Sequence, residues 1–162
     1  MTDIEARFSA LETRLRLLED HNEIQALMYS YGPAVDSGSA PEVAARWTED
    51  GVYDVDTGAM NSRAEIHAMV LSDAHQGYIH NGCGHVMSPA YIVVDGDTAV
   101  GTTHTQLIFQ RKDGKGYNIS RVTANRWEFV RTAEGWRVQV RKSRVLDGGE
   151  EGRGVFAAGV RT

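Results

Sequence analysis

Residues 116–146, GYNISRVTANRWEFVRTAEGWRVQVRKSRVL, decide the fold class of this chain. Apolar and polar residues alternate through most of this stretch, which is the two-residue period of a β-strand with one buried face. The segment TAEG at 132–135 divides it into strands near 116–132 and 136–146, joined as an antiparallel hairpin. We therefore expect an antiparallel sheet in the C-terminal half of the chain.

The segments before this hairpin extend the same sheet. Strand-like runs continue near 84–95 and 98–111, and the breaks between strands carry the Asp and Gly residues of tight turns, DGD at 95–97 and KDGKG at 112–116. A shorter strand is expected at 52–55.

The first half of the chain has the period of helices instead. Apolar residues recur at three- and four-residue steps, which predicts one helix over 3–19 and a stronger one over 22–37, with Asn22 as its N-cap. Two more helices are expected over 41–47 and 62–72. Helices followed by an antiparallel meander indicate an α+β fold. We expect a cone-shaped α+β barrel, in which a curved, mostly antiparallel sheet wraps against the N-terminal helices and encloses an apolar cavity for a small ligand.

One domain accounts for this whole pattern. The chain has 162 residues, of which 41% are hydrophobic, and this is enough for a single core. We place the domain at residues 1–147. Residues 148–162 are rich in glycine and are expected to form an irregular tail, whose apolar segment 155–157 docks on a pocket or a neighbour.

Composition excludes several classes of function. The net charge is −5 and there is no basic stripe, which argues against a nucleic-acid partner. The apolar runs are too short to span a membrane, and the charged N-terminus lacks the apolar core of a signal peptide, so we expect a cytoplasmic protein. The single cysteine excludes an intramolecular disulfide framework and a cysteine-rich zinc site.

Strand parity predicts that one arginine faces the core. In the last strand Trp136, Val138 and Val140 share a face, and the same face continues to Arg144. A guanidinium there needs a carboxylate, a ligand or the solvent of a cavity, so Arg144 is a candidate site residue. The alternative is a frayed strand end with Arg144 in water.

The preceding strand offers further polar candidates. Arg121, Thr123 and Asn125 fall on the face that also carries Trp127 and Phe129, which predicts a polar lining within an aromatic wall. A β-bulge between them would reverse this prediction.

Parity leaves the strand before it undecided. His104 and Thr105 point to opposite faces, and each face also carries apolar residues. Either residue is a candidate for the cavity. The alternative for His104 is a surface histidine that pairs across the sheet.

Asp36 is the most informative single residue. It lies near the C-terminus of the second predicted helix, where the helix dipole disfavours an anion, and directly follows the apolar pair Ala34–Val35. Such a carboxylate is a candidate partner for a histidine, and His85, which opens a strand, is the candidate histidine. An Asp–His pair would fix the imidazole tautomer and make it a general base. The alternative is an exposed loop aspartate and a loop histidine.

A metal site was the other possibility for these residues. Asp36 with His80 and His85 has a spacing that fits no standard metal motif, so we expect no metal. The sequence also has no glycine-rich phosphate loop and no recognisable cofactor motif, so we expect no cofactor.

The chain resembles the SnoaL-like branch of the nuclear-transport-factor-2 (NTF2) superfamily. The resemblance covers residues 10–147 and rests on four segments: EIQALMYSYGPAVDSG, RWTEDGVYDV, GHVMSPAYIVVDGDTAVGTTHTQLIF and NRWEFVRTAEGWRVQVRKSRV. The most similar group is the dehydratase-like one, with scytalone dehydratase, hexachlorocyclohexane dehydrochlorinase and bile-acid 7α-dehydratase. In that group a helix tyrosine precedes an aspartate by five residues, as Tyr31 precedes Asp36, and the catalytic histidine opens a strand, as His85 does.

The resemblance implies specific roles. His85 would abstract a proton from carbon, Asp36 would orient it, Tyr31 would donate a hydrogen bond to a carbonyl or leaving hydroxyl, and Arg144 would stabilise negative charge. The group's middle strand carries an acidic residue in one member and a second histidine in another, whereas this chain has His104–Thr105 there, so the substrate is left open. The residues expected to contact substrate are His104, Thr105, Arg121, Asn125, Tyr53 and Trp47.

Two functions from different classes follow. The first is a cofactor-independent lyase or isomerase that acts on a hydrophobic polycyclic or aromatic small molecule. The second is a non-catalytic carrier or accessory subunit, in which the same polar residues form a satisfied network. The resemblance also implies a homo-oligomer, a trimer more than a dimer.

Overall fold

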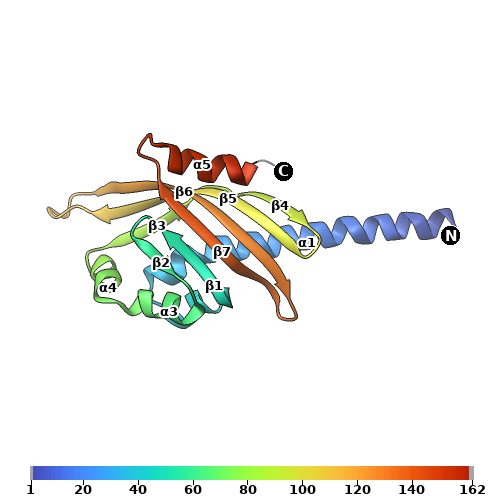
Figure 1. Cartoon of the computed structure of the whole chain (residues 1–162), viewed down its shortest axis with the longest axis horizontal. Coiled ribbons are helices and arrows are strands. Elements are labelled where there is room, and N and C mark those ends of the chain that lie inside the picture. The colour runs from blue at the N-terminus through green and yellow to red at the C-terminus, as the bar shows by residue number, and fades with distance from the viewer. Residues whose placement is uncertain (1, 161–162) are drawn as a thin grey trace.

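The computed structural model describes residues 2–160, which form a curved sheet with helices on both of its faces (Figure 1). The helices are α1 (Asp3–Asp36), α2 (Ala40–Ala44), α3 (Arg63–Leu71), α4 (Asp73–His80) and α5 (Glu150–Val160). The strands are β1 (Trp47–Val55), β2 (Gly58–Met60), β3 (Cys83–Met87), β4 (Tyr91–Asp95), β5 (Thr98–Gln110), β6 (Tyr117–Thr132) and β7 (Gly135–Val145).

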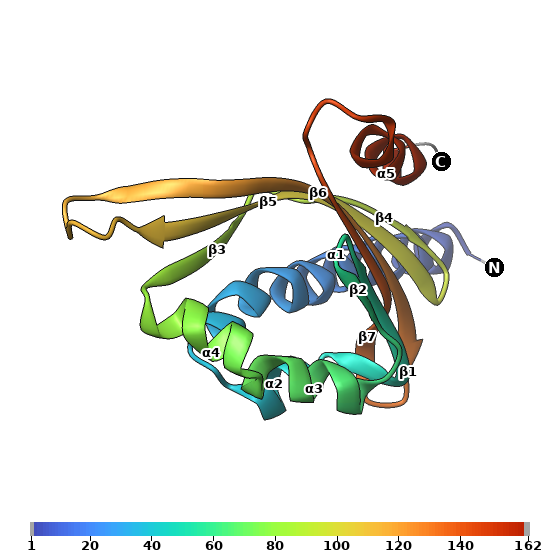
Figure 2. The same cartoon turned by 60° about the vertical axis from the view of Figure 1, so that its left-hand side comes forward.

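The sheet has the strand order β2-β1-β7-β6-β5-β3, with β4 also paired to β5. Only β1 and β7 run parallel; the other described pairs are antiparallel. Figure 2 shows α1, α3 and α4 on the inner side of the curved sheet and α5 on its opposite side. The sheet is curved without closing, and the prediction of an α+β fold with a sheet wrapped against N-terminal helices is confirmed.

The first helix is one continuous element rather than the two that were predicted. Thr2 begins it with a capping box: its side chain accepts a hydrogen bond from the backbone N–H of Glu5, and Glu5 accepts one from the backbone of Thr2. The expected break near Asn22 is absent because the polar residue Asp20 finds partners on the sheet. Its carboxylate accepts hydrogen bonds from Arg131 Nη2 at 2.7 Å and Trp136 Nε1 at 3.1 Å.

The core lies between the second half of α1 and the inner face of the sheet. Side chains spaced by three or four residues along α1 are buried against three tryptophans and a phenylalanine from β1, β6 and β7, and against α3. The members of this core with the largest buried side chains are Ile24, Met28, Tyr31, Val35, Val43, Trp47, Ile66, Val70, Trp127, Phe129, Trp136 and Val138. Among the residues that the structure describes, no helix is long and apolar enough to cross a membrane.

Two β-bulges determine which polar side chains face the cavity. In the β6–β7 pair, Glu128 lies opposite Val140 and Phe129 opposite Val138, so Gln139 is an extra residue in β7. Beyond this bulge the inward parity passes from even-numbered to odd-numbered residues of β7. In the β5–β6 pair the extra residue is Ser120.

The remaining differences from the sequence-based elements also have local causes. The strand expected at 84–95 is two strands, β3 and β4, because Pro89 lies between them and lacks the N–H that a ladder needs. The predicted irregular tail contains the helix α5, which packs on the outer face of β5, β6 and β7. Gly152, Val155 and Gly159 form its buried face.

Candidate active site

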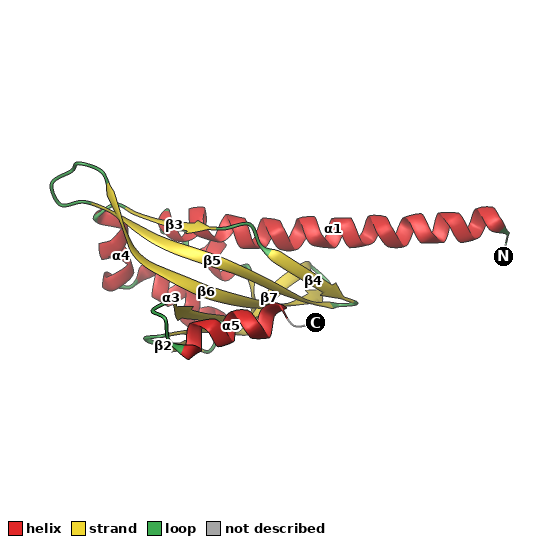
Figure 3. Ribbon diagram, turned by 90° about the horizontal axis from the view of Figure 1, so that it is seen from above, coloured by secondary structure: helices red, strands yellow, loops and turns green. Residues whose placement is uncertain are grey.

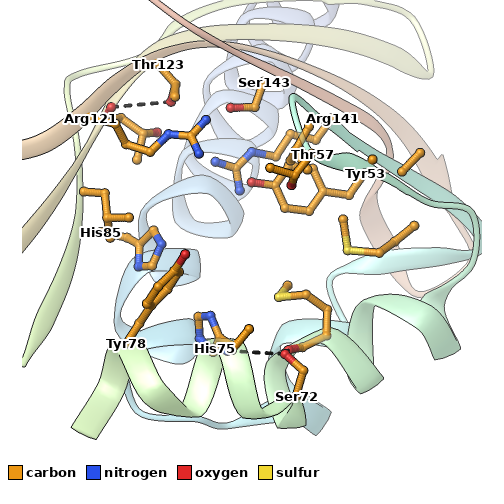
Figure 4. Close-up of a pocket in the computed structure, with 18 of the residues that line it drawn as sticks. Tyr53, Thr57, Ser72, His75, Tyr78, His85, Arg121, Thr123, Arg141 and Ser143 are labelled. Carbon is orange, nitrogen blue, oxygen red and sulfur yellow. Dashed lines mark hydrogen bonds between the residues drawn. The ribbon is translucent and has the colours of Figure 1, made fainter. Parts of the chain in front are cut away.

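A cavity of about 400 Å³ lies between the inner face of the sheet and the helices α1, α3 and α4. This is within the usual range for small-molecule sites, about 300–1,000 Å³. Figure 4 shows Arg121, Thr123, Arg141 and Ser143 entering it from β6 and β7, while His75 and Tyr78 enter from α4 on the opposite wall. The apolar part of the wall comes from Tyr53, Val55, Ala59, Met60, Met69 and Leu107.

Asp36 and His85 form a hydrogen-bonded pair at the edge of this cavity. His85 Nδ1 lies 2.5 Å from Asp36 Oδ1, and the backbone N–H of His85 donates to Asp36 Oδ2 at 2.7 Å. Both side chains are mostly buried, and His85 lines the cavity. Two contacts to one carboxylate fix both the position of the strand and the orientation of the imidazole ring.

The charge state of Asp36 determines the tautomer of His85. Burial raises the pKa of the Asp36 carboxyl, but the side-chain and backbone hydrogen bonds from His85, together with the His85 charge, outweigh it and leave this pKa below its ordinary value of 3.8. An ionised Asp36 can only accept hydrogen bonds, so the proton of the neutral imidazole lies on Nδ1. Nε2 is then the unprotonated nitrogen that is free to act as a base.

Cys83 completes the surroundings of Asp36. Its Sγ donates to Asp36 Oδ1 at 3.6 Å. Burial and then the negative charge of Asp36 raise the pKa of the Cys83 thiol to about 11. Asp36, Cys83 and His85 are the one group in residues 2–160 whose side-chain donor atoms approach closely enough for a metal. Because metals bind the thiolate, a metal at this set would have to displace the proton of the Cys83 thiol.

Arg141 is the most unusual residue of the cavity wall. The residue is 2% exposed, and its guanidinium carbon lies 4.4 Å, 4.5 Å and 4.1 Å from the ring centroids of Tyr31, Tyr53 and Trp127. Nε and Nη2 donate to Asn125 Oδ1 at 3.0 Å and 2.8 Å. Among the described residues Nη1 has no hydrogen-bond partner. Rings and an amide oxygen thus stabilise this cation where a carboxylate usually would.

A small network holds Arg141 in place. Asn125 receives both hydrogen bonds from Arg141 and donates through Nδ2 to Thr105 Oγ1 at 3.1 Å and Thr123 Oγ1 at 2.9 Å. Asn125 is fully buried and lies behind the cavity wall, whereas Thr105 and Thr123 line the cavity. The predicted inward face of β6 is therefore confirmed for these residues, and Thr105 rather than His104 faces the cavity.

Two other predicted residues also reach the cavity. Tyr31 is buried, lines the wall and packs edge-on against Tyr53 at 6.4 Å between ring centroids. Burial raises the pKa of the Tyr31 hydroxyl above its ordinary value, so it remains a hydrogen-bond donor at neutral pH. Arg121 lines the cavity as well, but its guanidinium forms an ion pair with Asp56.

The structure corrects the prediction for Arg144. Its guanidinium donates to both carboxylate oxygens of Asp54 at 2.8 Å and contacts Glu151 at 3.3 Å, beneath α5 on the outer face of the sheet. The parity argument was wrong because the bulge at Gln139 reverses the faces after Val138. The inward arginine of the last strand is Arg141 instead.

Two substrate-contact predictions are also wrong. His104 is exposed on the outer face, where its ring lies 4.5 Å from that of Phe156 in α5. Trp47 is fully buried under Tyr53 and Trp127, with ring centroids 5.7 Å and 6.3 Å away, and supports the cavity wall without reaching it. Tyr53, one of the other candidates, does line the cavity.

Sequence reasoning missed the wall that α4 contributes. His75 is buried, donates through Nε2 to the carbonyl oxygen of Val35 at 2.9 Å, and its ring lies 6.0 Å from the His85 ring. Ser72 is the N-cap of this helix, because its side chain accepts a hydrogen bond from the backbone N–H of His75. Asp73 in the first turn strengthens this helix-start signal, but Gly77 weakens the apolar periodicity that would have revealed the helix.

Comparisons with known proteins agree with this architecture. Residues 16–142 match the SnoaL-like domain. An NTF2-like protein with a cystatin-like fold from Novosphingobium aromaticivorans is 39% identical, with a TM-score of 0.88 over 91% of this chain and 95% of that one. No curated protein matches the chain at a significant level.

More distant structures share the fold alone. A protein of unknown function from Mycobacterium tuberculosis has a TM-score of 0.70 at 23% identity, over 84% of this chain and 75% of that one. A protein from Catenulispora acidiphila, solved in complex with S-DNPA, has a TM-score of 0.66 at 22% identity, over 77% of this chain and 92% of that one. The match over residues 16–142 and the 39% identity show that this chain belongs to the family of SnoaL-like domains and has an NTF2-like fold.

Proposed function

We propose that this protein is a cofactor-independent proton-transfer enzyme, a dehydratase-like lyase or an isomerase, for a hydrophobic aromatic or polycyclic small molecule. The observation that carries the proposal is the pair of hydrogen bonds between Asp36 and His85 at the wall of the cavity. A histidine so oriented, with its second nitrogen left free, is the arrangement that general-base catalysis requires.

The first step is proton abstraction. His85 Nε2 takes a proton from a carbon next to a carbonyl group, the C–H bond breaks, and its electron pair moves to the carbonyl oxygen as an enolate. Asp36 keeps the imidazole oriented and stabilises the imidazolium that forms. In an isomerase the imidazolium returns the proton to another carbon of the substrate. In a dehydratase the enolate expels a β-hydroxyl group as the new C=C bond forms, and the imidazolium supplies the proton that releases it as water.

Arg141 is the residue that stabilises the negative charge on the enolate oxygen. It is buried, it has no carboxylate partner among the described residues, and its Nη1 lacks an acceptor. A fixed cation in an apolar wall stabilises a developing enolate more than a neutral carbonyl. Tyr31, held protonated beside it, donates a hydrogen bond to the same oxygen or to the departing hydroxyl.

The shape of the cavity supports a hydrophobic substrate. About 400 Å³ accommodates a molecule of two to four fused rings, and aromatic and methionine side chains line much of the wall. Tyr78 offers an aromatic ring on the α4 wall, and Met60 and Met69 offer flexible apolar contacts.

The test measures proton abstraction directly. The protein is incubated in D₂O with a panel of aromatic and polycyclic ketones, with and without a β-hydroxyl group, and deuterium at the acidic carbon is followed by NMR. Exchange reports the first step whether isomerisation or elimination follows. We expect exchange with at least one polycyclic ketone, and a loss of at least about 100-fold in the His85→Gln protein, as for removal of a general base.

His104→Gln is the matched control, since it makes the same change at an exposed histidine on the outer face. Its exchange rate is expected to equal that of the unchanged protein. If compounds of the panel bind in the cavity but none of them exchanges deuterium, the enzyme proposal is wrong. The protein would then be a carrier or an accessory subunit. Equal losses in the two variants would contradict the assignment of His85.

A further inference from the structure

The first half of α1 is a free-standing arm. Residues 3–19 are all exposed, and Figure 3 shows this part of the helix projecting well beyond the sheet. The arm begins where the contacts of α1 with the sheet end, at the hydrogen bonds of Asp20 to Arg131 and Trp136. A helix of about 15 residues is marginally stable in water by itself, so its sequence should show what stabilises it.

The arm carries a continuous apolar stripe. Five large side chains follow one another at steps of four, three, four and three residues, and each is between 56% and 64% exposed: Ile4, Phe8, Leu11, Leu15 and Leu18. Alternating steps of four and three are the d and a positions of the heptad repeat of a coiled coil. The described chain leaves this stripe without a partner.

The charges beside the stripe follow the same repeat. The e positions are all glutamate, namely Glu5, Glu12 and Glu19, and the g positions are Arg7, Arg14 and His21. In a parallel coiled coil each g residue faces the e residue of the next heptad in the partner helix. Arg7 then meets Glu12 of the partner subunit, and Arg14 meets Glu19 of the partner subunit. An antiparallel pair would bring like charges together instead.

We propose that this arm pairs in parallel with the same arm of a second copy of the chain, as a short coiled coil closed by the d and a residues. A second copy presents the same apolar stripe at the same heptad spacing, and the flanks of the stripe are complementary to themselves in charge only in the parallel direction. The next a position is Asn22, which is exposed, and a polar Asn at one a position specifies register in parallel coiled coils.

The contacts of α1 with its own domain do not cover the a and d positions of the arm, which form the seam of the proposed coiled coil. The residues of α1 that face the sheet, Ile24 and Met28, are at c and g positions of the same repeat, whereas the seam residue Asn22 lies on the exposed side. The arm also carries more acidic than basic residues, with Asp3 and three glutamates against Arg7, Arg14 and Arg16. This balance favours a second copy over an anionic membrane surface as the partner.

Cysteine cross-linking tests the seam in the full-length protein. A d position faces its own counterpart across a parallel seam, at a separation that a disulfide can bridge. Leu11→Cys is therefore expected to give a covalent dimer under mild oxidation. Leu17→Cys is the matched control: Leu17 is also an exposed leucine of the arm, but it lies at a c position outside the seam. Equal cross-linking in the two variants, or none in either, would overturn the proposal even if the domains associate elsewhere.

Charge reversal tests the direction of pairing. Arg14→Glu and Glu19→Arg each place like charges opposite one another in the parallel arrangement, and each should raise the dissociation constant of the dimer about 3- to 10-fold by sedimentation equilibrium. The double variant restores the pair with its signs exchanged and should return most of the affinity. Tighter association of Arg14→Glu alone would be the result of antiparallel pairing and would contradict the proposal.

Discussion

The backbone of Gly32 lies directly against the carbonyl oxygen of His85, so that a Cβ atom added at Gly32 would come within 2.5 Å of this oxygen. No side chain can therefore replace hydrogen at this position without moving α1 away from β3. The close approach brings Asp36, one turn further along α1, to the distance at which its carboxylate receives both hydrogen bonds from His85.

Gly32→Ala should therefore damage the candidate site through the backbone. The contact is with a strand carbonyl rather than the end of a flexible side chain, so strand and helix must separate. We expect a loss of about 1–3 kcal/mol in the free energy of unfolding, the usual cost of overpacking, measured by urea denaturation. NMR of the His85 imidazole should also show loss of its hydrogen bond to Asp36.

Gly77→Ala is the control for this substitution. Gly77 is also helical, in α4, and an added Cβ there meets nothing within 4 Å. The change should leave stability unchanged or raise it by up to about 1 kcal/mol, because alanine is the better helix former. If both variants lost the same stability, the close approach of Gly32 to His85 would not be the cause.

Arg141→Met should remove a preference for anionic ligands. The buried guanidinium has no carboxylate partner among the described residues and lines the cavity, so a carboxylate or enolate analogue there gains a charged hydrogen bond from it. Such a bond contributes about 1.5–3 kcal/mol, which is roughly 10- to 100-fold in affinity. We expect calorimetry with a matched pair, an aromatic carboxylate and its primary amide, to show this preference in the unchanged protein and its loss in the variant.

Lys142→Met separates this local effect from a general change of charge. Lys142 is the next residue of β7, is half exposed, and lies 3.9 Å from Asp54 on the outer face. The Lys142→Met substitution changes the net charge by the same amount as Arg141→Met but alters no residue of the cavity wall. The preference for the carboxylate should survive in this variant, and equal losses in both would show that only long-range charge is involved.

Much of the fold follows from periodicity, and the inward residues of β6 illustrate why. Thr123 and Asn125 were expected on the same face as Trp127 and Phe129, and the structure confirms it, because no bulge interrupts β6 between them. Likewise Asp36 stands out in the sequence because a carboxylate at a helix end beside apolar residues needs a partner, and the structure supplies His85.

The candidate site was less predictable where register depends on distant strands. Gln139 is an ordinary strand residue by composition, and only its pairing with β6 makes it a bulge. That one residue moves the inward position from Arg144 to Arg141. The wall from α4 was missed for a different reason: its cavity residues His75 and Tyr78 are polar or amphipathic and give no apolar stripe.

The pKa of Asp36 predicts a specific acid sensitivity. Its folded-state pKa lies below the ordinary value of 3.8, so the folded state binds fewer protons there than the unfolded state. The stabilisation is fully present above that value and is lost as the pH falls from it through the folded-state pKa. The unfolding free energy of Asp36→Asn should fall less steeply with acid in this range, by urea denaturation at successive pH values. Identical slopes would contradict the low pKa.

The thiol of Cys83 provides an independent measure of the same carboxylate. With a pKa of about 11 it is protonated at neutral pH, so alkylation by iodoacetamide should be slow at pH 8 and still rising above pH 9. Because part of the rise comes from the charge of Asp36, the Asp36→Asn protein should react faster at pH 8, with its rate profile displaced to lower pH. The unfolded protein in urea gives the reference profile. An unchanged profile in Asp36→Asn would show that burial alone raises this pKa.

The packing of α5 on the outer face gives the last prediction. A Cβ at Gly159 would clash with Thr102 Oγ1 and lie 3.2 Å from the Thr102 Cβ, whereas one at Gly154 would meet nothing within 4 Å. Gly159→Val should therefore lift α5 from β5 and speed tryptic cleavage after Arg153, while Gly154→Val should not. Since the cavity lies on the other face of the sheet, ligand affinity should be the same in both variants. A loss of affinity in Gly159→Val would mean that α5 helps to hold the curvature of the sheet around the cavity.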